Sequence, residues 1–375
     1  MKLGISGLFL KPSQVGGAEF MLRGLLFGLA QIPNLQLYVF IDRKLTDWLR
    51  ELNLGEAHAV IPITMVGNRV VSEITQIPWQ ANRLGLDGII YPNYLTPWRS
   101  LLKMPSATVI HDLNYLHFPD LFSWRKKVWL RTAHQNTLAN SDITVAISEF
   151  VRNDIVKNYP LKSQHSLTVI PNPILWERFS HSMPPVMEVK QPFILTVANH
   201  YQHKNLATLI KAFQQLPSAC DQVNLVLVGQ LPESLVGMRR DRCDDLSSLV
   251  KALNLQDRVK VTGYISDAEL AWYYNFAEMF AYPSLFEGFG MPPVEAMGMG
   301  LPTLTTRCTA IPEATLGLAQ YINDPLDVDE WRDRMAQILQ FRSDFLPLQS
   351  TVDLIRSTYD PVAIAQKYVD LFKCL

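Results

Sequence analysis

The sequence predicts an α/β protein of two domains, each built around a parallel β-sheet. A chain of 375 residues is longer than one ordinary domain. Short apolar runs alternate with amphipathic stretches in both halves, which is the pattern of strand–helix–strand units. Between the halves, residues 181–192 are rich in Pro and Met and show no periodicity, as expected of a linker.

In the first half, apolar runs predict strands over 2–8, 36–41, 88–91, 107–111, 143–147 and 166–170. Helices are expected between them, for example over 18–31 and 123–140. In the second half, strands are expected over 193–198, 223–228, 259–262, 279–281, 302–305 and 319–322. Helices are expected there over 206–216, 244–253, 267–276 and 291–299. The amphipathic tail 361–372 predicts a helix that crosses back onto the first domain.

The composition excludes several classes of protein. Four cysteines without a C-x-x-C pair argue against a zinc site or a disulfide framework and favour a reducing compartment. The apolar start, residues 3–10, lacks a cleavage site and favours a buried strand over a signal peptide. No run of 18 apolar residues exists, so a cytoplasmic protein is expected. A net charge of −1 without an aromatic-lined basic groove argues against nucleic-acid binding.

Two candidate ligand-binding positions follow strands of the first half. Gly16 and Gly17 open a helix, where backbone N–H groups favour an anion such as a diphosphate, although a plain turn is the alternative. His111 ends an apolar run, and ligands of open α/β sheets bind at such strand ends. A neutral His ring there can hydrogen-bond a sugar hydroxyl, although it could equally cap the following turn.

Two stronger candidates follow strands of the second half. Lys204 lies in the loop 199–205, where an ammonium would offset charge on a leaving phosphate, unless it is a solvated loop residue. The segment 282–297 carries Glu287 in a Gly-rich loop and Glu295 in a helix that starts with two prolines. Both carboxylates can accept bonds from vicinal hydroxyls. A glycosidase pair is the competing interpretation, disfavoured because one Glu lies in a loop and the other in a helix.

Together these residues resemble the retaining glycosyltransferases of family 4, over nearly the full length of the chain. In the first half the matching segments are 16–19 (GGAE), 111–113 (HDL), 146–150 (AISEF) and 171–173 (PNP). In the second half they are 204–205 (KN), 261–264 (VTGY), 283–284 (PS), 287–290 (EGFG), 295–297 (EAM), 300–302 (GLP) and 312–313 (PE). The order and spacing of the second set are the more specific.

The resemblance implies the GT-B fold, in which two Rossmann-like domains face each other across a cleft. An acceptor-binding domain would span 1–183, with the C-terminal helix 358–375 packed back on it, and a nucleotide-sugar-binding domain would span 190–357. The resemblance further implies that the anomeric configuration is retained. It also implies that no metal or other cofactor is needed besides the nucleotide-diphosphate sugar, which is a substrate.

The resemblance also implies roles for single residues. His111 would contact the transferred sugar, Lys204 the diphosphate and Glu287 the sugar hydroxyls, and Glu295 would hold the ribose. Further donor-binding positions would be Gly16, Gly17, Asn199, His203, Gly263, Tyr264, Gly288, Phe289, Gly290 and Met291. Many relatives carry an Arg where this chain has Asn199 or His203. A protonated His203 could replace that charge, and activity would then fall as the pH rises.

A metal site is not expected. The only D-x-D pattern joins Asp327 and Asp329, in a segment that is typical of a helix N-terminus, where acidic residues interact favourably with the dipole. The histidines include no H-x-x-x-H pair, the spacing that metal ligands on a helix often have.

A basic and aromatic segment, 118–131, includes Trp124, Lys126, Lys127 and Trp129. Such a helix can lie on an anionic membrane or hold a lipid-linked acceptor, which would place the protein at the inner face of the cell membrane. The alternative is a solvated helix whose apolar side faces the core.

The expected donor is UDP-glucose, with GDP-mannose as the other possibility. The expected acceptor is a glycan or lipid-linked acceptor of envelope or exopolysaccharide synthesis. Three alternatives remain open: a sugar-nucleotide epimerase or a phosphorylase on the same scaffold, and a non-catalytic subunit that only binds a sugar nucleotide.

Overall fold

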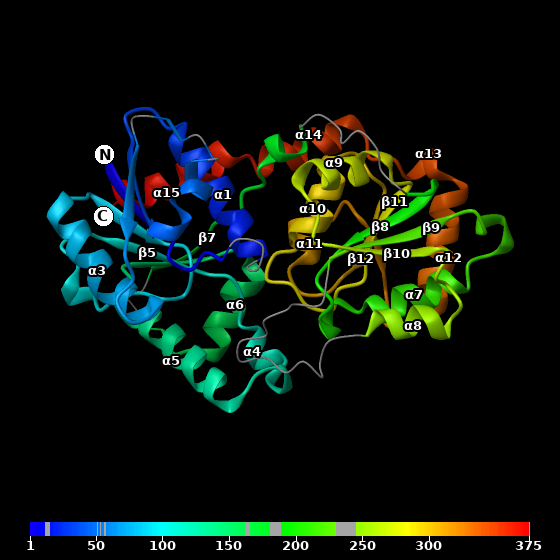
Figure 1. Ribbon diagram of the computed structural model, residues 1–375, viewed down its shortest axis with the longest axis horizontal. Coiled ribbons are helices and arrows are strands. Elements are labelled where there is room, and N and C mark those ends of the chain that lie inside the picture. Colours follow the sequence, from blue (N-terminus) through cyan, green and yellow to red (C-terminus); the bar gives the residue numbers. More distant parts are fainter. Residues whose placement is uncertain are drawn as a thin grey trace. The chain divides into compact units, whose positions relative to one another are not determined.

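The computed structural model describes residues 1–11, 16–50, 52, 54–55, 58–161, 166–180, 189–229 and 245–374. The chain divides into two units (Figure 1). The first comprises Met1–Leu175 and Tyr359–Leu375, and the second comprises Trp176–Thr358. Most of the expected linker, 181–188, lies outside the described residues. The division falls before it, and Arg178 forms ion pairs with Asp267 and Glu295 within the second unit.

The first unit contains a seven-stranded parallel sheet of order β3-β2-β1-β4-β5-β6-β7. Its strands are β1 (Lys2–Ser6), β2 (Gln36–Asp42), β3 (Ala59–Ile63), β4 (Gly88–Tyr91), β5 (Ser106–Ile110), β6 (Ile143–Ala146) and β7 (Ser166–Val169). Its longer helices are α1 (Gly17–Ala30), α3 (Arg69–Leu84), α5 (Trp124–Asn140), α6 (Glu149–Asn158) and α15 (Pro361–Lys373), with the short α2 (Thr46–Arg50) and α4 (Asn114–His117). Apolar runs such as Gly88–Tyr91 are buried along their whole length, as expected of parallel strands covered on both faces.

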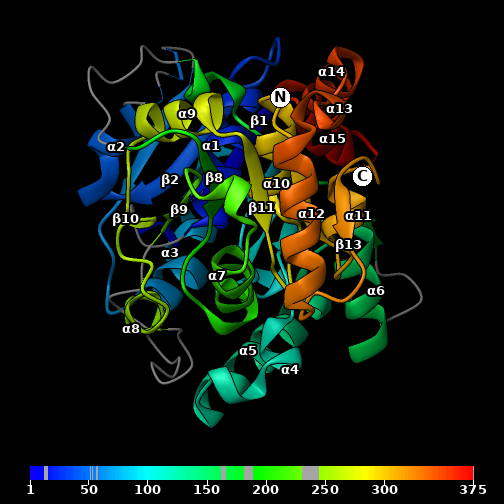
Figure 2. The same ribbon diagram turned by 90° about the vertical axis from the view of Figure 1, so that its right-hand side faces the viewer.

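The second unit contains a six-stranded parallel sheet of order β10-β9-β8-β11-β12-β13. Its strands are β8 (Phe193–Val197), β9 (Asn224–Val228), β10 (Val259–Gly263), β11 (Met279–Tyr282), β12 (Thr303–Thr306) and β13 (Gln320–Ile322). Its helices are α7 (Leu206–Gln214), α8 (Leu246–Ala252), α9 (Asp267–Phe276), α10 (Met291–Gly298), α11 (Ile311–Ala314), α12 (Val328–Gln340), α13 (Arg342–Phe345) and α14 (Gln349–Thr358). Helices α7 and α12 pack together (Figure 2). The buried side chains of Trp331 and Phe213 belong to the same hydrophobic core.

All twelve strands predicted from the sequence are present within a residue or two of their expected ends. The edge strand β3 and the helix α3 that follows it were not predicted. α3 contains Pro78, which removes a backbone donor from the helix interior and weakens the helical pattern.

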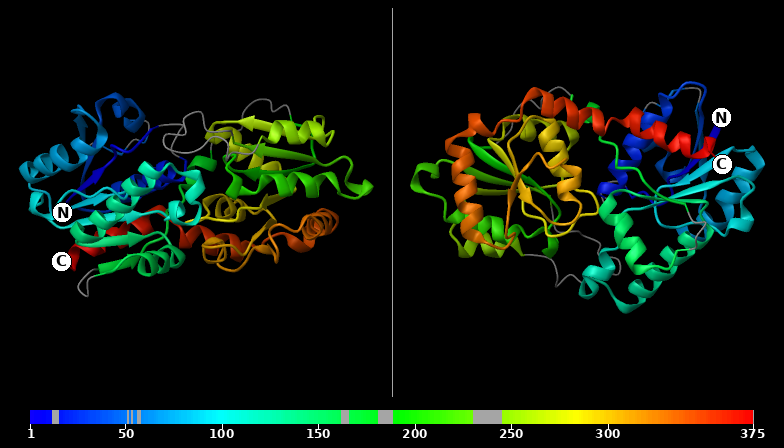
Figure 3. Two further views of the ribbon diagram at one scale, coloured as in Figure 1. Left: turned by 90° about the horizontal axis from the view of Figure 1, so that it is seen from below. Right: turned by 180° about the vertical axis from the view of Figure 1, so that it is seen from behind.

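The C-terminal helix packs against the first helix within the first unit. α15 contacts α1 closely, because a Cβ on Gly28 would lie only 2.0 Å from the carbonyl oxygen of Pro361. Further along the same helix, Phe372 occupies the space beside Gly88. Both ends of the chain therefore lie in the first unit, and they are near each other in both views of Figure 3.

Candidate functional site

The most specific candidate site lies where the strand order of the second sheet reverses. β8 and β11 are neighbours, and the chain runs outward from β8 through β9 and β10 before it returns to β11. In open α/β sheets, ligands bind outside the carboxyl ends of such a strand pair. The loop after β8 carries Lys204 and the loop after β11 carries Glu287. Two of the predicted site residues therefore meet at this point.

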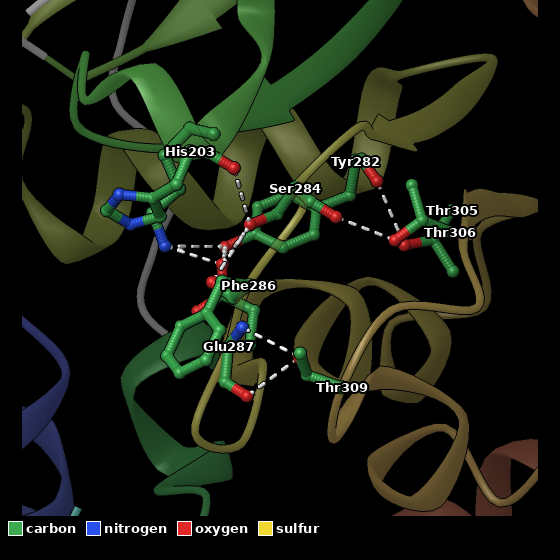
Figure 4. A network of polar contacts seen from close by, with 9 residues as sticks. His203, Tyr282, Ser284, Phe286, Glu287, Thr305, Thr306 and Thr309 are labelled. Atoms are coloured by element: carbon green, nitrogen blue, oxygen red, sulfur yellow. Dashed lines mark hydrogen bonds and ion pairs between the residues drawn. The ribbon is translucent and has the colours of Figure 1, made fainter. Parts of the chain in front are cut away.

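The side chain of Glu287 is the centre of a polar network (Figure 4). Its Oε1 accepts hydrogen bonds from Lys204 Nζ at 2.5 Å, Ser284 Oγ at 2.6 Å and the Tyr282 hydroxyl at 2.7 Å. Its backbone N–H donates to Thr309 Oγ1, which in turn donates to the Glu287 carbonyl, both at 2.9 Å. Among the described residues, none donates to Oε2, so that oxygen is available to a ligand hydroxyl.

Burial and charge act in opposite directions on Glu287. Burial alone would raise the pKa of its carboxyl group, but the Lys204 ammonium and the hydrogen bonds from Lys204 and Ser284 outweigh it. The pKa of Glu287 therefore lies below its ordinary value. At neutral pH the site holds a carboxylate beside an ammonium, both largely buried. Such a pair can accept bonds from sugar hydroxyls and offset charge on a phosphate.

His203 does not supply the positive charge that the sequence analysis gave it. The side chain is 9% exposed, and burial together with the nearby Lys204 ammonium lowers the pKa of His203 to about 3. The ring is neutral at physiological pH, so the expectation that a protonated His203 replaces the missing Arg is wrong. The residue instead joins the two loops through its backbone, because its carbonyl accepts a bond from Leu285 N at 2.7 Å.

The start of α10 limits which backbone groups can face an anion. Gly290 precedes the helix with φ 98°, a left-handed conformation that favours glycine. Pro292 and Pro293 carry no N–H, so the donors of this first turn come from the residues up to Met291. The predicted positions Gly288, Phe289, Gly290 and Met291 therefore lie in the part of this turn that carries backbone N–H groups.

Glu295 is placed in a buried ionic cluster that the sequence did not reveal. Its Oε1 accepts from Arg178 Nη1 and its Oε2 accepts from the Tyr274 hydroxyl, both at 3.0 Å. Burial raises the pKa of Glu295 above its ordinary value in spite of Arg178. Arg178 and Tyr274 lie far from Glu295 in sequence, so no local motif could have identified them.

The remaining predicted donor positions lie around the ends of β8, β9 and β10. Gly263 has φ 75°, and its carbonyl accepts a bond from Gly229 N at 3.1 Å. Tyr264 follows it with 59% of its surface exposed, and Asn199 is exposed after β8. Residues 230–244, which follow Gly229, lie outside the described part of the chain.

The first unit holds the other predicted residues. His111 follows β5, and its Nε2 donates to the Pro92 carbonyl at 2.7 Å. Burial lowers the pKa of His111, so the ring is neutral and Nδ1 is its acceptor nitrogen. Gly16 precedes α1 with φ 62°, and a Cβ there would meet nothing within 4 Å. Residues 12–15, which precede Gly16, lie outside the described part.

Sequence reasoning missed a second polar cluster in the first unit. Glu73 on α3 is 1% exposed and accepts bonds from Ser6 Oγ at 2.8 Å and Arg69 Nε at 3.0 Å. Ser6 ends β1 and Tyr91 ends β4, the pair at which the order of the first sheet reverses. Burial and the Glu73 carboxylate raise the pKa of Tyr91. The cluster was missed because α3 itself was not predicted.

The acidic D-x-D segment is a helix N-terminus, as predicted. Asp327 Oδ1 accepts from the backbone N–H groups of Asp329 and Glu330 at the start of α12. Within the described residues, no group of three or more His, Cys, Asp or Glu side chains is arranged to hold a metal ion. No helix of the described part is long and apolar enough to cross a lipid bilayer.

Comparison with protein families divides the chain as the structure does. Residues 15–177 match the family described as glycosyltransferase family 4, and residues 182–345 match the glycosyl transferases of group 1. The two matches together cover most of the chain.

Curated relatives include mannosyltransferases of O-antigen synthesis. The chain is 27% identical over 255 residues to O-antigen chain mannosyltransferase B of Escherichia coli, covering 66% of this chain and 64% of that protein. It is 29% identical over 240 residues to O-antigen chain mannosyltransferase RfbU of Salmonella typhimurium, covering 64% of this chain and 62% of that protein. The alignments thus span less than two thirds of these relatives.

Solved structures share the fold over the whole chain. Sucrose-phosphate synthase from Thermosynechococcus elongatus superposes with a TM-score of 0.75 at 19% identity, covering 100% of this chain and 98% of that one. Anabaena HepE, solved in complex with UDP and glucose, superposes with a TM-score of 0.74 at 18% identity, covering both chains completely. These likenesses confirm the GT-B fold predicted from the sequence.

Proposed function

Because the chain belongs to the glycosyltransferases of family 4 and group 1, we propose that it transfers a hexose from a nucleotide-diphosphate sugar to a glycan or lipid-linked acceptor. The observation that supports this most directly is the Lys204–Glu287 ion pair at the strand-order reversal of the second sheet. It places the Lys204 ammonium and the Glu287 carboxylate, which can accept hydrogen bonds from hydroxyl groups, close enough together for one sugar phosphate to contact both. In this proposal Lys204, Glu287 and Glu295 have the roles that the family resemblance implies for them.

The proposed chemistry needs positioning and charge stabilisation more than covalent catalysis. Glu287 Oε2 would accept from hydroxyls of the transferred sugar, and Lys204 with the N–H groups up to Met291 would stabilise the leaving diphosphate. A phosphate oxygen of the leaving group would take the proton of the acceptor hydroxyl on the same face, so that the configuration is retained. No metal is required in this scheme. Transfer in EDTA tests that point, and loss of turnover that Mg²⁺ restores would contradict it.

We place GDP-mannose ahead of UDP-glucose as the donor, which reverses the preference drawn from the sequence. The curated relatives at 27% and 29% identity are both mannosyltransferases. The UDP-glucose complex of HepE is 17% identical to this chain, and at that level it supports only the fold. The relatives also support an acceptor of the cell envelope.

The donor class can be tested by thermal shift. A ligand that binds only the folded state raises the melting temperature, and at 100-fold its Kd it adds about 2.7 kcal/mol. GDP and GDP-mannose are expected to raise Tm more than UDP and UDP-glucose do. Turnover assays then separate the alternatives: donor altered without acceptor indicates an epimerase, a need for inorganic phosphate indicates a phosphorylase, and binding without any turnover indicates a non-catalytic subunit.

The surface of α5 supports contact with a lipid-linked acceptor or an anionic membrane. Trp124, Val128 and Trp129 are 67%, 57% and 38% exposed, whereas Leu130 on the same helix is buried. Exposed aromatic side chains beside cationic ones match the interface of an anionic bilayer. In a flotation assay with vesicles containing phosphatidylglycerol, changing Lys126 and Lys127 to Glu is expected to reduce binding about tenfold or more, since each cation contributes about 1 kcal/mol. Unchanged flotation would reject the proposal.

A further inference from the structure

Arg178 is a buried cation in the second unit to which neither the sequence nor the family resemblance gives a role. It belongs to a single 3-10 turn, Trp176–Phe179, and its side chain is 6% exposed. Its Nε and Nη2 both donate to Asp267 Oδ1, at 3.1 and 2.8 Å, and its Nη1 donates to Glu295 Oε1 at 3.0 Å. The guanidinium therefore bridges two carboxylates on the separate helices α9 and α10.

Glu295 is held from two sides. Arg178 binds Oε1, and the hydroxyl of Tyr274, a buried residue of α9, donates to Oε2. A carboxylate has about four acceptor positions, so one on each oxygen is still available. α10 follows directly on the loop of Glu287, and Glu295 lies in its second turn. The carboxylate is thus fixed on the helix that starts at the proposed diphosphate site.

The cluster is poorly explained by stability alone. It places one cation between two anions, and burying charges costs several kcal/mol per ion that pairing returns only in part. Burial and Asp267 both act to raise the pKa of Glu295, and Arg178 acts against them. Without the guanidinium, the pKa of Glu295 would rise further and Oε1 would lose its hydrogen-bond donor. The planar fork of Arg binds two oxygens in a fixed geometry, which a Lys ammonium cannot do.

We propose that Arg178 is a positioning residue for nucleotide recognition: together with Tyr274 it holds the Glu295 carboxylate in one orientation, so that the carboxylate accepts hydrogen bonds from the ribose hydroxyls of the donor. This inference rests on the proposed function, which supplies the nucleotide. Arg178 itself does not touch the donor. Its substitution changes how well ribose is distinguished from deoxyribose and leaves the chemistry at Glu287 in place.

The experiment compares ribonucleotides with deoxyribonucleotides. Dissociation constants are measured by calorimetry for GDP and UDP and for their 2′-deoxy and 3′-deoxy analogues. Wild-type protein is expected to bind the ribonucleotide of its preferred base about tenfold more tightly than at least one deoxy analogue. The reason is that the analogue lacks a hydroxyl that donates a hydrogen bond to a charged group. Arg178→Lys is expected to reduce this preference to less than about threefold, and Tyr274→Phe to reduce it in part.

A matched control comes from the same unit. Arg332 on α12 also binds two carboxylates, Asp329 at 2.5 Å and Asp333 at 2.7 Å, away from the strand-order reversal. Arg332→Lys is expected to leave the ribose preference unchanged. Tyr274→Phe keeps the packed ring and removes only the hydroxyl, so it serves if Arg178→Lys does not fold.

Two results would overturn the inference while leaving the proposed function intact. One is a lower melting temperature in Arg178→Lys with an unchanged ribose preference, which would make Arg178 a structural brace only. The other is wild-type protein that binds nucleotides but does not distinguish ribose from deoxyribose. If no nucleotide binds the wild type, the proposed function itself fails.

Discussion

Lys204 and Glu287 form a buried ion pair, so replacing one partner should affect stability more than replacing both. Activity should be lost in either case. Lys204→Met leaves an ionised carboxylate buried beside Ser284 and Tyr282, and the loss of one partner of a buried pair costs about 3–5 kcal/mol. The double variant Lys204→Met/Glu287→Gln should recover most of that stability. Urea unfolding of both variants and of the wild type measures this difference. A double variant no more stable than Lys204→Met would contradict the pairing.

Turnover should not recover with stability. Each single substitution removes a group proposed to contact the sugar or the diphosphate, which lowers kcat by a factor of about 100 or more. The double variant is therefore expected to be folded and inactive. Steady-state kinetics on all three variants, with circular dichroism as a control of folding, separate the two effects.

Because two histidines are buried, we expect acid to destabilise the fold. We also expect that these histidines give activity no pH dependence between pH 6 and 8. Burial lowers the pKa of His203 to about 3 and that of His134 to about 4, whereas an unfolded His titrates near 6.5. Above pH 6.5 both histidines are neutral in the folded and in the unfolded protein, and they do not reduce stability. As the pH falls toward 3–4, the unfolded protein binds protons first, and the free energy of unfolding decreases. At pH 5 each should have lost about 2 kcal/mol of unfolding free energy.

The measurement is urea unfolding at pH 5, 6 and 7, in which His203→Gln should show a shallower slope than the wild type. Neither histidine changes charge between pH 6 and 8, so neither gives turnover a pH dependence in that range. A decrease of activity across this range that disappears in His203→Gln would restore the role that the sequence analysis assigned to a protonated His203.

At the level of single elements, the contact between α1 and α15 gives a sharp steric prediction. Gly28→Ala places a methyl group 2.0 Å from the backbone oxygen of Pro361, where no side chain can yield. Such overpacking should cost about 3 kcal/mol, more than the roughly 1 kcal/mol that Ala gains over Gly in a helix. Gly24→Ala in the same helix is the control, because its methyl group would meet the Pro173 ring at 3.1 Å. Similar melting temperatures for the two variants would contradict this packing.

The elements that sequence reasoning found and missed differ in a physical way. Central strands such as β4 are apolar throughout because both faces are covered, so their runs were recognised. β3 lies at the sheet edge, alternates half-buried and exposed residues up to its buried last residue and contains Pro62, so it has no such run. α3 was missed with it because Pro78 interrupts its pattern.

The candidate site could be predicted where its residues lie in loops that follow recognisable strands. Lys204 and Glu287 each lie in the loop that follows an apolar strand, so the strand ends identified both. Arg178 and Glu73 could not be found this way, because each meets its partners through the fold, across 117 residues to Glu295 and 67 residues to Ser6. The pKa of His203 was equally inaccessible, since it depends on burial and not on the neighbours in sequence.

At the scale of the whole molecule, the second unit is one continuous segment and the first is not. Trp176–Thr358 contains its entire sheet and core, whereas the first unit needs Tyr359–Leu375 in addition to Met1–Leu175. Residues 176–358 produced alone are therefore expected to unfold cooperatively on heating. Residues 1–175 alone expose the face of α1 that α15 covers, and they should bind a hydrophobic dye and melt without a sharp transition. Adding a peptide of residues 359–375 should reverse this, and a cooperative melt of 1–175 by itself would contradict the prediction.

The packing of α15 on α1 also determines the order in which the two units can fold during synthesis. The second unit can complete its sheet once residues 176–358 have left the ribosome. The first unit can be completed only after residues 359–375 have also emerged. The unit that is synthesised first is thus completed last, and a truncation that removes α15 would destabilise the first unit and leave the second intact.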